Sequence, residues 1–309
     1  MKICTACSEE LPKEKFSKKQ WQSKQHQRRC KECIADNREV KSEAPANDDE
    51  VPLPCAGGET DEDIFKEPSP RDECPICCLP LPIVTELQRY QSCCGKMLCI
   101  GCIRAVLGGD NRCLCPYCRA PAPKSEGESI ERVKKRAEAD DANAIFSLGC
   151  FYDSGEKGLP QDCNKALELW LRAGELGSVE ANNNVATAYL NGRGVERDTE
   201  KAKYYWELAA IGGDPEARHN LGVQEENAGN MDRAMRHWMI AAGAGLDASL
   251  RAIQNCYFYT DATKDDFVKA LRTHKAAKNA MKSDQREAAS DQSESSDVVL
   301  MREIWLSVE

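Results

Sequence analysis

The nine residues KALELWLRA at positions 165–173 decide the fold, because their pattern returns along the chain. It reappears as KAKYYWELA at 201–209 and as RAMRHWMIA at 233–241, with a fainter copy, KALRTHKAA, at 269–277. In the first three copies an alanine, a tryptophan four positions on and a second alanine three further on share one face of a helix. Trp170, Trp206 and Trp238 stand 36 and 32 residues apart. This period predicts stacked helical repeats with the three indoles in their core.

A companion helix precedes each of these copies. The segments 144–152, 181–189 and 217–225 are in register with one another, and residues 130–139 fit the second helix of a degenerate leading repeat. Gly177, Gly213 and Gly245 follow the tryptophan-bearing helices, and glycine is common just after a helix ends. We therefore expect pairs of helices joined by short turns.

The repeat unit resembles the Sel-1-like repeat, a relative of the tetratricopeptide repeat. The loop NGRGVERD at 191–198, with Asp198 as the expected N-cap, carries the resemblance, and GEKGLPQD at 155–162 carries it more loosely. The resemblance implies an all-α solenoid over residues 126–282 with a concave face. On that solenoid we expect a protein substrate or partner to bind.

Cysteines form a second pattern. Of eighteen cysteines, twelve stand in five Cys-x-x-Cys pairs and one doublet: Cys4/Cys7, Cys30/Cys33, Cys74/Cys77, Cys93/Cys94, Cys99/Cys102 and Cys115/Cys118. The sequence begins without the pattern of a signal peptide, so we expect an intracellular protein, cytoplasmic or nuclear, whose thiols bind metal instead of forming disulfides. Twelve thiolates are the ligands of three tetrahedral zinc ions.

The first two pairs predict a Cys4 zinc finger in residues 1–41, because two such turns can point four thiolates at one ion. This segment resembles zinc-finger modules of chromatin-silencing adaptor proteins, in which Leu-Pro and Phe-Ser also follow the first pair. Its net charge of +5 and the lysines around Trp21 are also features of nucleic-acid-binding surfaces. We expect Phe16 and Trp21 to form a small core instead, and no nucleic-acid partner, because the whole chain carries a net charge of −9.

The other pairs, in residues 73–121, resemble a RING finger in their alternation. The resemblance implies that Cys74, Cys77, Cys99 and Cys102 bind one zinc ion, that Cys93, Cys94, Cys115 and Cys118 bind a second, and that residues 103–107 form the central helix. Lys96 stands where the common pattern has a zinc-binding histidine, so we assign both members of the doublet to an all-cysteine RING. Adjacent ligands need a sharp turn, which Gly95 permits. The alternative is that Cys113 replaces one of the doublet.

The RING resemblance implies ubiquitin–protein ligation without a covalent nucleophile. It assigns Ile76, Val106 and Pro116 to binding a ubiquitin-conjugating enzyme, and Arg119, as the catalytic residue, to positioning the ubiquitin thioester. The alternative is a non-catalytic zinc-binding scaffold that binds proteins without any transfer reaction. No Ser/His/Asp set, phosphate-binding loop or carboxylate pair in the sequence indicates another enzyme.

The remaining segments are polar. Residues 42–72 carry a net charge of −8 and few large apolar side chains, so we expect a disordered acidic linker there and a Ser-rich acidic linker at 283–297. Residues 298–309 place Leu300, Ile304 and Trp305 on one face of an amphipathic helix. The apolar fraction of 41% is low for one large core. The sequence contains no run of about 18 apolar residues, so we expect no membrane partner.

Overall fold

The computed structural model describes residues 2–3, 10–11, 64–66, 69–83, 87–107, 114–259 and 262–291. The chain divides into two compact units, Met1–Ala56 and Gly57–Glu309. In the first unit, β1 (Lys2–Ile3) pairs antiparallel with β2 (Glu10–Leu11). The predicted zinc ligands of that unit, Cys4, Cys7, Cys30 and Cys33, lie outside the described residues, as does the predicted helix at 298–309.

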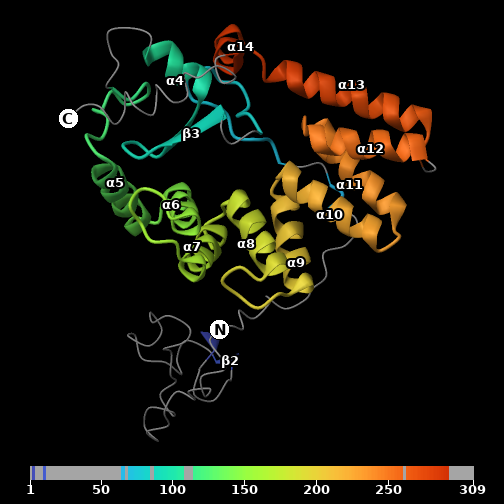
Figure 1. The fold of residues 1–309 in the computed structure, drawn as a ribbon, viewed down its shortest axis with the longest axis horizontal. Coiled ribbons are helices and arrows are strands. Elements are labelled where there is room, and N and C mark those ends of the chain that lie inside the picture. Colours follow the sequence, from blue (N-terminus) through green and yellow to red (C-terminus); the bar gives the residue numbers. More distant parts are fainter. Residues whose placement is uncertain are drawn as a thin grey trace, which may run out of the picture. The chain divides into compact units, whose positions relative to one another are not determined.

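The second unit contains the helical repeats, which follow one another from α5 to α13 (Figure 1). They are α5 (Glu126–Glu138), α6 (Ala142–Ser154), α7 (Cys163–Glu175), α8 (Val179–Asn191), α9 (Thr199–Ile211), α10 (Pro215–Asn227), α11 (Met231–Gly243), α12 (Asp247–Tyr259) and α13 (Lys264–Ala280). From α5 to α13 each helix packs against the next in the chain. The all-α solenoid is therefore present as predicted. No helix in the described part of the chain is long and apolar enough to cross a bilayer.

The alanine and tryptophan face of each repeat forms the core, as predicted. Trp170, Trp206 and Trp238 are only 6%, 2% and 1% exposed. Two of the indoles pack directly on a glycine of the preceding helix, and a larger residue would not fit there. A Cβ added at Gly149 would lie 2.6 Å from Trp170 Nε1, and one added at Gly222 would lie 2.4 Å from Trp238 Nε1. In the middle repeat, Trp206 Nε1 donates to Asn183 Oδ1 at 3.0 Å. Small residues on one helix thus make room for the indole of the next.

The ends of the repeat helices follow the local sequence signals. Asp198 caps α9 by accepting from the backbone nitrogens of Glu200 and Lys201, as predicted. Gly177, Gly213 and Gly245 have φ angles of 94°, 100° and 100°, the left-handed region that favours glycine after a helix. These turns are short, so consecutive helices stay side by side.

The cysteine module, residues 73–121, combines a small hairpin with one helix. β3 (Gln88–Gln91) pairs antiparallel with β4 (Lys96–Cys99), and α4 (Ile100–Leu107) follows directly. Single bridges join Glu73 to Pro80 and Leu114 to Pro121. The buried cluster here consists of Cys74, Leu81, Leu98, Cys99, Ile100, Cys102, Ile103 and, from outside the module, Ala289. A core this small usually needs an additional brace, such as bound metal.

The structure departs from the expected linkers at two places. α14 (Asp284–Asp291) is helical within 283–297 and packs on α4 (Figure 1), with Ala289 only 3% exposed. Ile64, within the expected linker 42–72, is 4% exposed, and its carbonyl accepts from Arg218 of α10. Both stretches are too polar to fold alone, and packing on other elements buries Ile64 and Ala289.

Candidate metal centres

Eight cysteines of the cysteine module gather in two clusters. The first consists of Cys74, Cys77, Cys99 and Cys102, and the second of Cys93, Cys94, Cys115 and Cys118. Within each cluster the four sulfur atoms all lie within 4.8 Å of one another. The structure thus brings together the two ligand sets that the alternating pairs predicted. Cys113, the alternative ligand, lies outside the described residues.

The sulfur positions fit tetrahedral zinc. Zn–S distances of about 2.3 Å require sulfur atoms about 3.8 Å apart. The Sγ–Sγ distance is 3.9 Å both between Cys77 and Cys99 and between Cys94 and Cys115, and it is 3.4 Å between Cys118 and Cys93. Four thiols per cluster complete a coordination shell without an open position, which is typical of structural zinc. Each cluster can therefore hold one zinc ion, and zinc binding itself stays a prediction.

Tight backbone turns present these sulfurs. The nitrogen of Cys78 donates to the Cys74 carbonyl at 2.8 Å, and the nitrogen of Arg119 donates to the Cys115 carbonyl at 3.0 Å. Both of the donating residues have positive φ angles, 53° and 61°. At the doublet, Gly95 has a φ of 71°, and its nitrogen donates to the Gln91 carbonyl at 2.8 Å. This is the sharp turn that two adjacent ligands were expected to need.

Burial opposes ionisation of several cluster thiols. It raises the pKa of Cys94 to about 11 and also raises the pKa values of Cys93 and Cys102. At Cys74 burial acts in the same direction, but hydrogen bonds from backbone groups and from the Cys99 thiol outweigh it and lower the pKa to about 7. Zinc binds thiolates, so loading the clusters must release protons.

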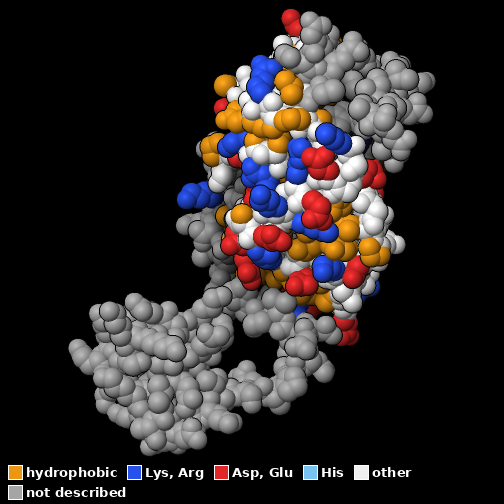
Figure 2. All heavy atoms as spheres, turned by 90° about the vertical axis from the view of Figure 1, so that its left-hand side faces the viewer, with side chains coloured by type: hydrophobic (Ala, Val, Ile, Leu, Met, Phe, Trp, Pro, Cys, Tyr) orange, Lys and Arg blue, Asp and Glu red, His pale blue; other side chains and the backbone are white. Residues whose placement is uncertain are grey.

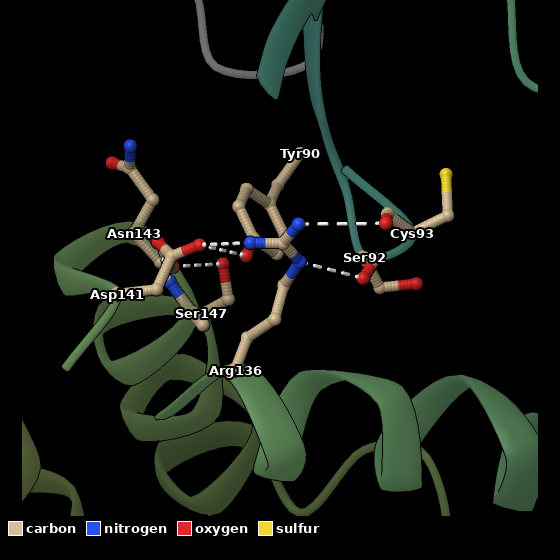
Figure 3. Close-up of polar contacts among 8 residues, drawn as sticks. Tyr90, Ser92, Cys93, Arg136, Asp141, Asn143 and Ser147 are labelled. Carbon is tan, nitrogen blue, oxygen red and sulfur yellow. Dashed lines mark hydrogen bonds and ion pairs between the residues drawn. The ribbon is translucent and has the colours of Figure 1, made fainter. Parts of the chain in front are cut away.

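The first repeat helix supports the loop that carries the second cluster (Figure 3). From α5, Arg136 Nε donates to the Ser92 carbonyl at 3.0 Å and Nη2 donates to the Cys93 carbonyl at 3.4 Å. Its Nη1 forms an ion pair with Asp141 Oδ2 at 2.9 Å, and the same oxygen accepts from the Tyr90 hydroxyl at 2.9 Å. One guanidinium thereby ties the Cys93 loop to the start of the repeats.

The last described helix supports the first cluster. From α14, Arg286 Nη2 donates to Cys77 Sγ at 3.3 Å and to the Leu79 carbonyl at 3.2 Å, and Nη1 donates to the Pro80 carbonyl at 2.7 Å. A Cβ added at Gly101 of α4 would lie only 2.9 Å from the backbone nitrogen of Arg286, so α14 packs directly on α4. Sequence reasoning misses both supporting arginines, because neither stands in a motif with the cysteines that it supports.

Three of the four residues assigned to ubiquitin transfer lie on or beside the Cys-x-x-Cys turns. Ile76, inside the first turn, is 39% exposed. Pro116, inside the last turn, is half-buried, and Arg119, just after it, is exposed. Val106 lies on α4 and is half-buried. The structure therefore leaves these side chains at least partly accessible, and their roles stay predictions.

Comparison with known proteins identifies the repeats. The Sel1 repeat family model matches residues 142–178 and 179–214, which contain α6 to α9. These residues are therefore Sel1 repeats, as the resemblance implied. The match covers the two repeats from α6 to α9 and extends neither to the later repeat helices nor to the cysteine module.

Similar proteins share only part of their length with this chain. The ERAD-associated E3 ubiquitin-protein ligase component HRD3B of Arabidopsis thaliana is 33% identical over 113 residues, which are 36% of this chain and 18% of that protein. Chitin synthase regulatory factor 4 of Schizosaccharomyces pombe is 29% identical over 132 residues, 42% of this chain and 21% of that protein. A crystal structure of a Sel1 repeat protein from Oxalobacter formigenes aligns with a TM-score of 0.43 at 25% identity, covering 50% of this chain and 64% of that one.

Proposed function

We propose that this chain is a protein-interaction scaffold whose helical repeats bind partner proteins. The Sel1 repeats at 142–214 carry this proposal, because repeats of this kind bind proteins through extended surfaces. The names of the two relatives point the same way, since one is a component of a ligase and the other a regulatory factor. In this role the cysteine module is a second, zinc-braced interaction unit.

Partner capture from cells tests the scaffold role. The full chain is compared with Trp206→Ala, which removes a large side chain from the core of the repeats, and with Cys94→Ser, which removes a cysteine of the second cluster. We expect Trp206→Ala to lose the partners and Cys94→Ser to keep those that bind the repeats. Circular dichroism first shows whether the repeats of Trp206→Ala are unfolded. If they are, and partners still bind both variants equally well, the proposal is overturned.

Ubiquitin ligation is a second candidate function, supported by one specific observation. The two cysteine clusters interleave along the chain, and the partly exposed Ile76 lies on a turn of the first cluster while Arg119 follows the last ligand of the second. In this role Ile76, Val106 and Pro116 bind a conjugating enzyme. The planar guanidinium of Arg119, with five donors, would hold the ubiquitin thioester in a reactive geometry.

Discharge of ubiquitin from charged conjugating enzymes onto free lysine tests the ligase role. We expect the wild-type chain to accelerate discharge from at least one enzyme of a broad panel. Arg119→Ala should slow discharge while binding of the conjugating enzyme persists, whereas Ile76→Ala should weaken binding itself. Lys134→Ala, which removes a charge from α5, is the matched control. Absence of acceleration across the panel would leave the scaffold as the function.

A further inference from the structure

A short segment of the acidic stretch lies on the repeats. Ile64 is 4% exposed, and its carbonyl accepts a hydrogen bond from Arg218 Nη1 on α10. The neighbouring ring of Phe65 lies 4.6 Å from the ring of His237, centroid to centroid, on α11. Two residues of the segment therefore contact side chains from two consecutive repeat helices.

Arginines surround the Phe65 ring. The guanidinium carbon of Arg236 lies 3.6 Å from the ring centroid and that of Arg233 lies 5.3 Å from it, both within the range of cation–π attraction. We call the set Arg218, Arg233, Arg236 and His237 the arginine face. Within the described residues, Glu225 forms an ion pair with Arg233 of this face at 3.0 Å. By contrast, the face of the molecule shown in Figure 2 intersperses acidic and basic side chains.

The arginine face contains buried polar atoms that lack partners within the described residues. Arg218 is 1% exposed, and its Nε has no hydrogen-bond partner there; the same holds for Nδ1 of His237, also 1% exposed. Among the described residues, burial is the one cause that lowers the pKa of Arg218, to about 10, and burial beside Arg218 and Arg233 lowers the pKa of His237 to about 4. Burying a cation without an acid is costly. Apolar side chains could hold Ile64 and Phe65 in place with a smaller desolvation penalty.

The sequence around Ile64 and Phe65 is acidic. Residues 60–68 read TDEDIFKEP, so three acids precede the Ile-Phe pair and one follows it closely. Resting on the scaffold function proposed above, we propose that the arginine face binds a short acidic segment of a partner protein that carries an aliphatic–aromatic pair. Ile64 and Phe65 occupy this face as the chain's own competing copy of that segment.

Competition within the chain has a measurable consequence. A tethered segment acts at an effective concentration of about 1 mM. If a free peptide binds the open face with a Kd of about 0.1 mM, the occupied face should therefore bind it about tenfold more weakly. Partner binding should also weaken with added salt, because charges of opposite sign attract one another less when screened.

Fluorescence anisotropy with the full chain tests this inference. The probe is a labelled peptide of residues 57–70, GGETDEDIFKEPSP, and its control carries alanine at both positions of the Ile-Phe pair. We expect the variant Ile64→Ala/Phe65→Ala to bind the probe about tenfold more tightly than wild type and to ignore the control peptide. Adding Arg236→Glu to that variant should abolish binding, whereas Lys264→Glu, an exposed charge reversal on α13, should leave it unchanged.

The outcomes separate this inference from the scaffold function. All variants are first shown to melt like wild type. If the double variant then fails to bind the probe, or binds it equally well with Arg236→Glu, the arginine face is not a peptide site. If partner capture still depends on folded repeats in that case, the scaffold function stands and only this inference falls.

Discussion

Replacing Arg136 with alanine should weaken zinc binding at the second cluster without changing any ligand. The side chain makes hydrogen bonds to the Ser92 and Cys93 carbonyls and an ion pair with Asp141. Arg136→Ala removes all three interactions and leaves the Tyr90–Asp141 hydrogen bond in place. The loop that carries Cys93 then loses its tie to α5 and must be ordered by zinc alone.

The size of the effect follows from these contacts. Hydrogen bonds that involve a charged group contribute about 1.5–3 kcal/mol each when buried. The Arg136 side chain is 30% exposed and that of Asp141 is 18% exposed, so water replaces part of what is lost. We therefore expect a total of about 2 kcal/mol. That corresponds to about a 30-fold loss of zinc affinity, within the 10- to 100-fold range typical of residues that support metal ligands.

A chelator titration of the zinc-loaded chain measures this loss. The ion of the second cluster is identified as the one missing in Cys94→Ser, and its release is compared between wild type, Arg136→Ala and Lys135→Ala. Lys135 is an exposed neighbour on the same helix, so its removal controls for the loss of one positive charge. We expect only Arg136→Ala to release the ion at lower chelator concentration. Equal release from Arg136→Ala and wild type would refute the supporting role of this arginine.

Two further predictions concern the repeats. Trp206→Ala should lower the free energy of unfolding by about 3–5 kcal/mol in thermal melts, because the indole is 2% exposed and bonded to Asn183. A melting curve identical to that of wild type would contradict the place of this indole in the core. Burial, together with the nearby Glu216 and Glu180 charges, raises the pKa of Asp214 from its ordinary 3.8 to about 7, so stability should fall as the pH rises from about 4 to about 7. Asp214→Asn keeps a capping residue for α10 and should remove this pH dependence of stability. The prediction fails if thermal melts of Asp214→Asn at pH 5 and pH 8 differ as much as those of wild type.

Local and periodic signals account for the parts of the structure that sequence predicted. Alanine and tryptophan at fixed helical spacing placed Trp170, Trp206 and Trp238 in the core, and Asp198 and Gly213 marked helix ends. Each of these signals acts within a few residues, so it can be read without knowing the fold. The alternation of cysteine pairs resembles a RING finger, and that resemblance correctly implied which thiols meet.

Contacts between distant segments were not predictable in this way. Arg286 reaches Cys77 across 209 positions of the chain, and Arg218 reaches the Ile64 carbonyl across 154. Each is one of 42 lysines and arginines, and nothing in its neighbourhood sets it apart from a solvated surface charge. Such contacts depend on how the repeats and the cysteine module are placed against each other, which no periodicity records.

The sequence by itself therefore determined the helical repeats and their tryptophan core, since spacing and side-chain chemistry specify these locally. The grouping of the cysteines followed from the resemblance of their spacing to a RING finger. Only the tertiary structure decided that two polar stretches, at Ile64 and at α14, are ordered. Their composition alone predicts linkers, because neither can bury enough apolar surface within itself. Ile64 and Ala289 become buried only against other elements, and that gain exists only once those elements have folded.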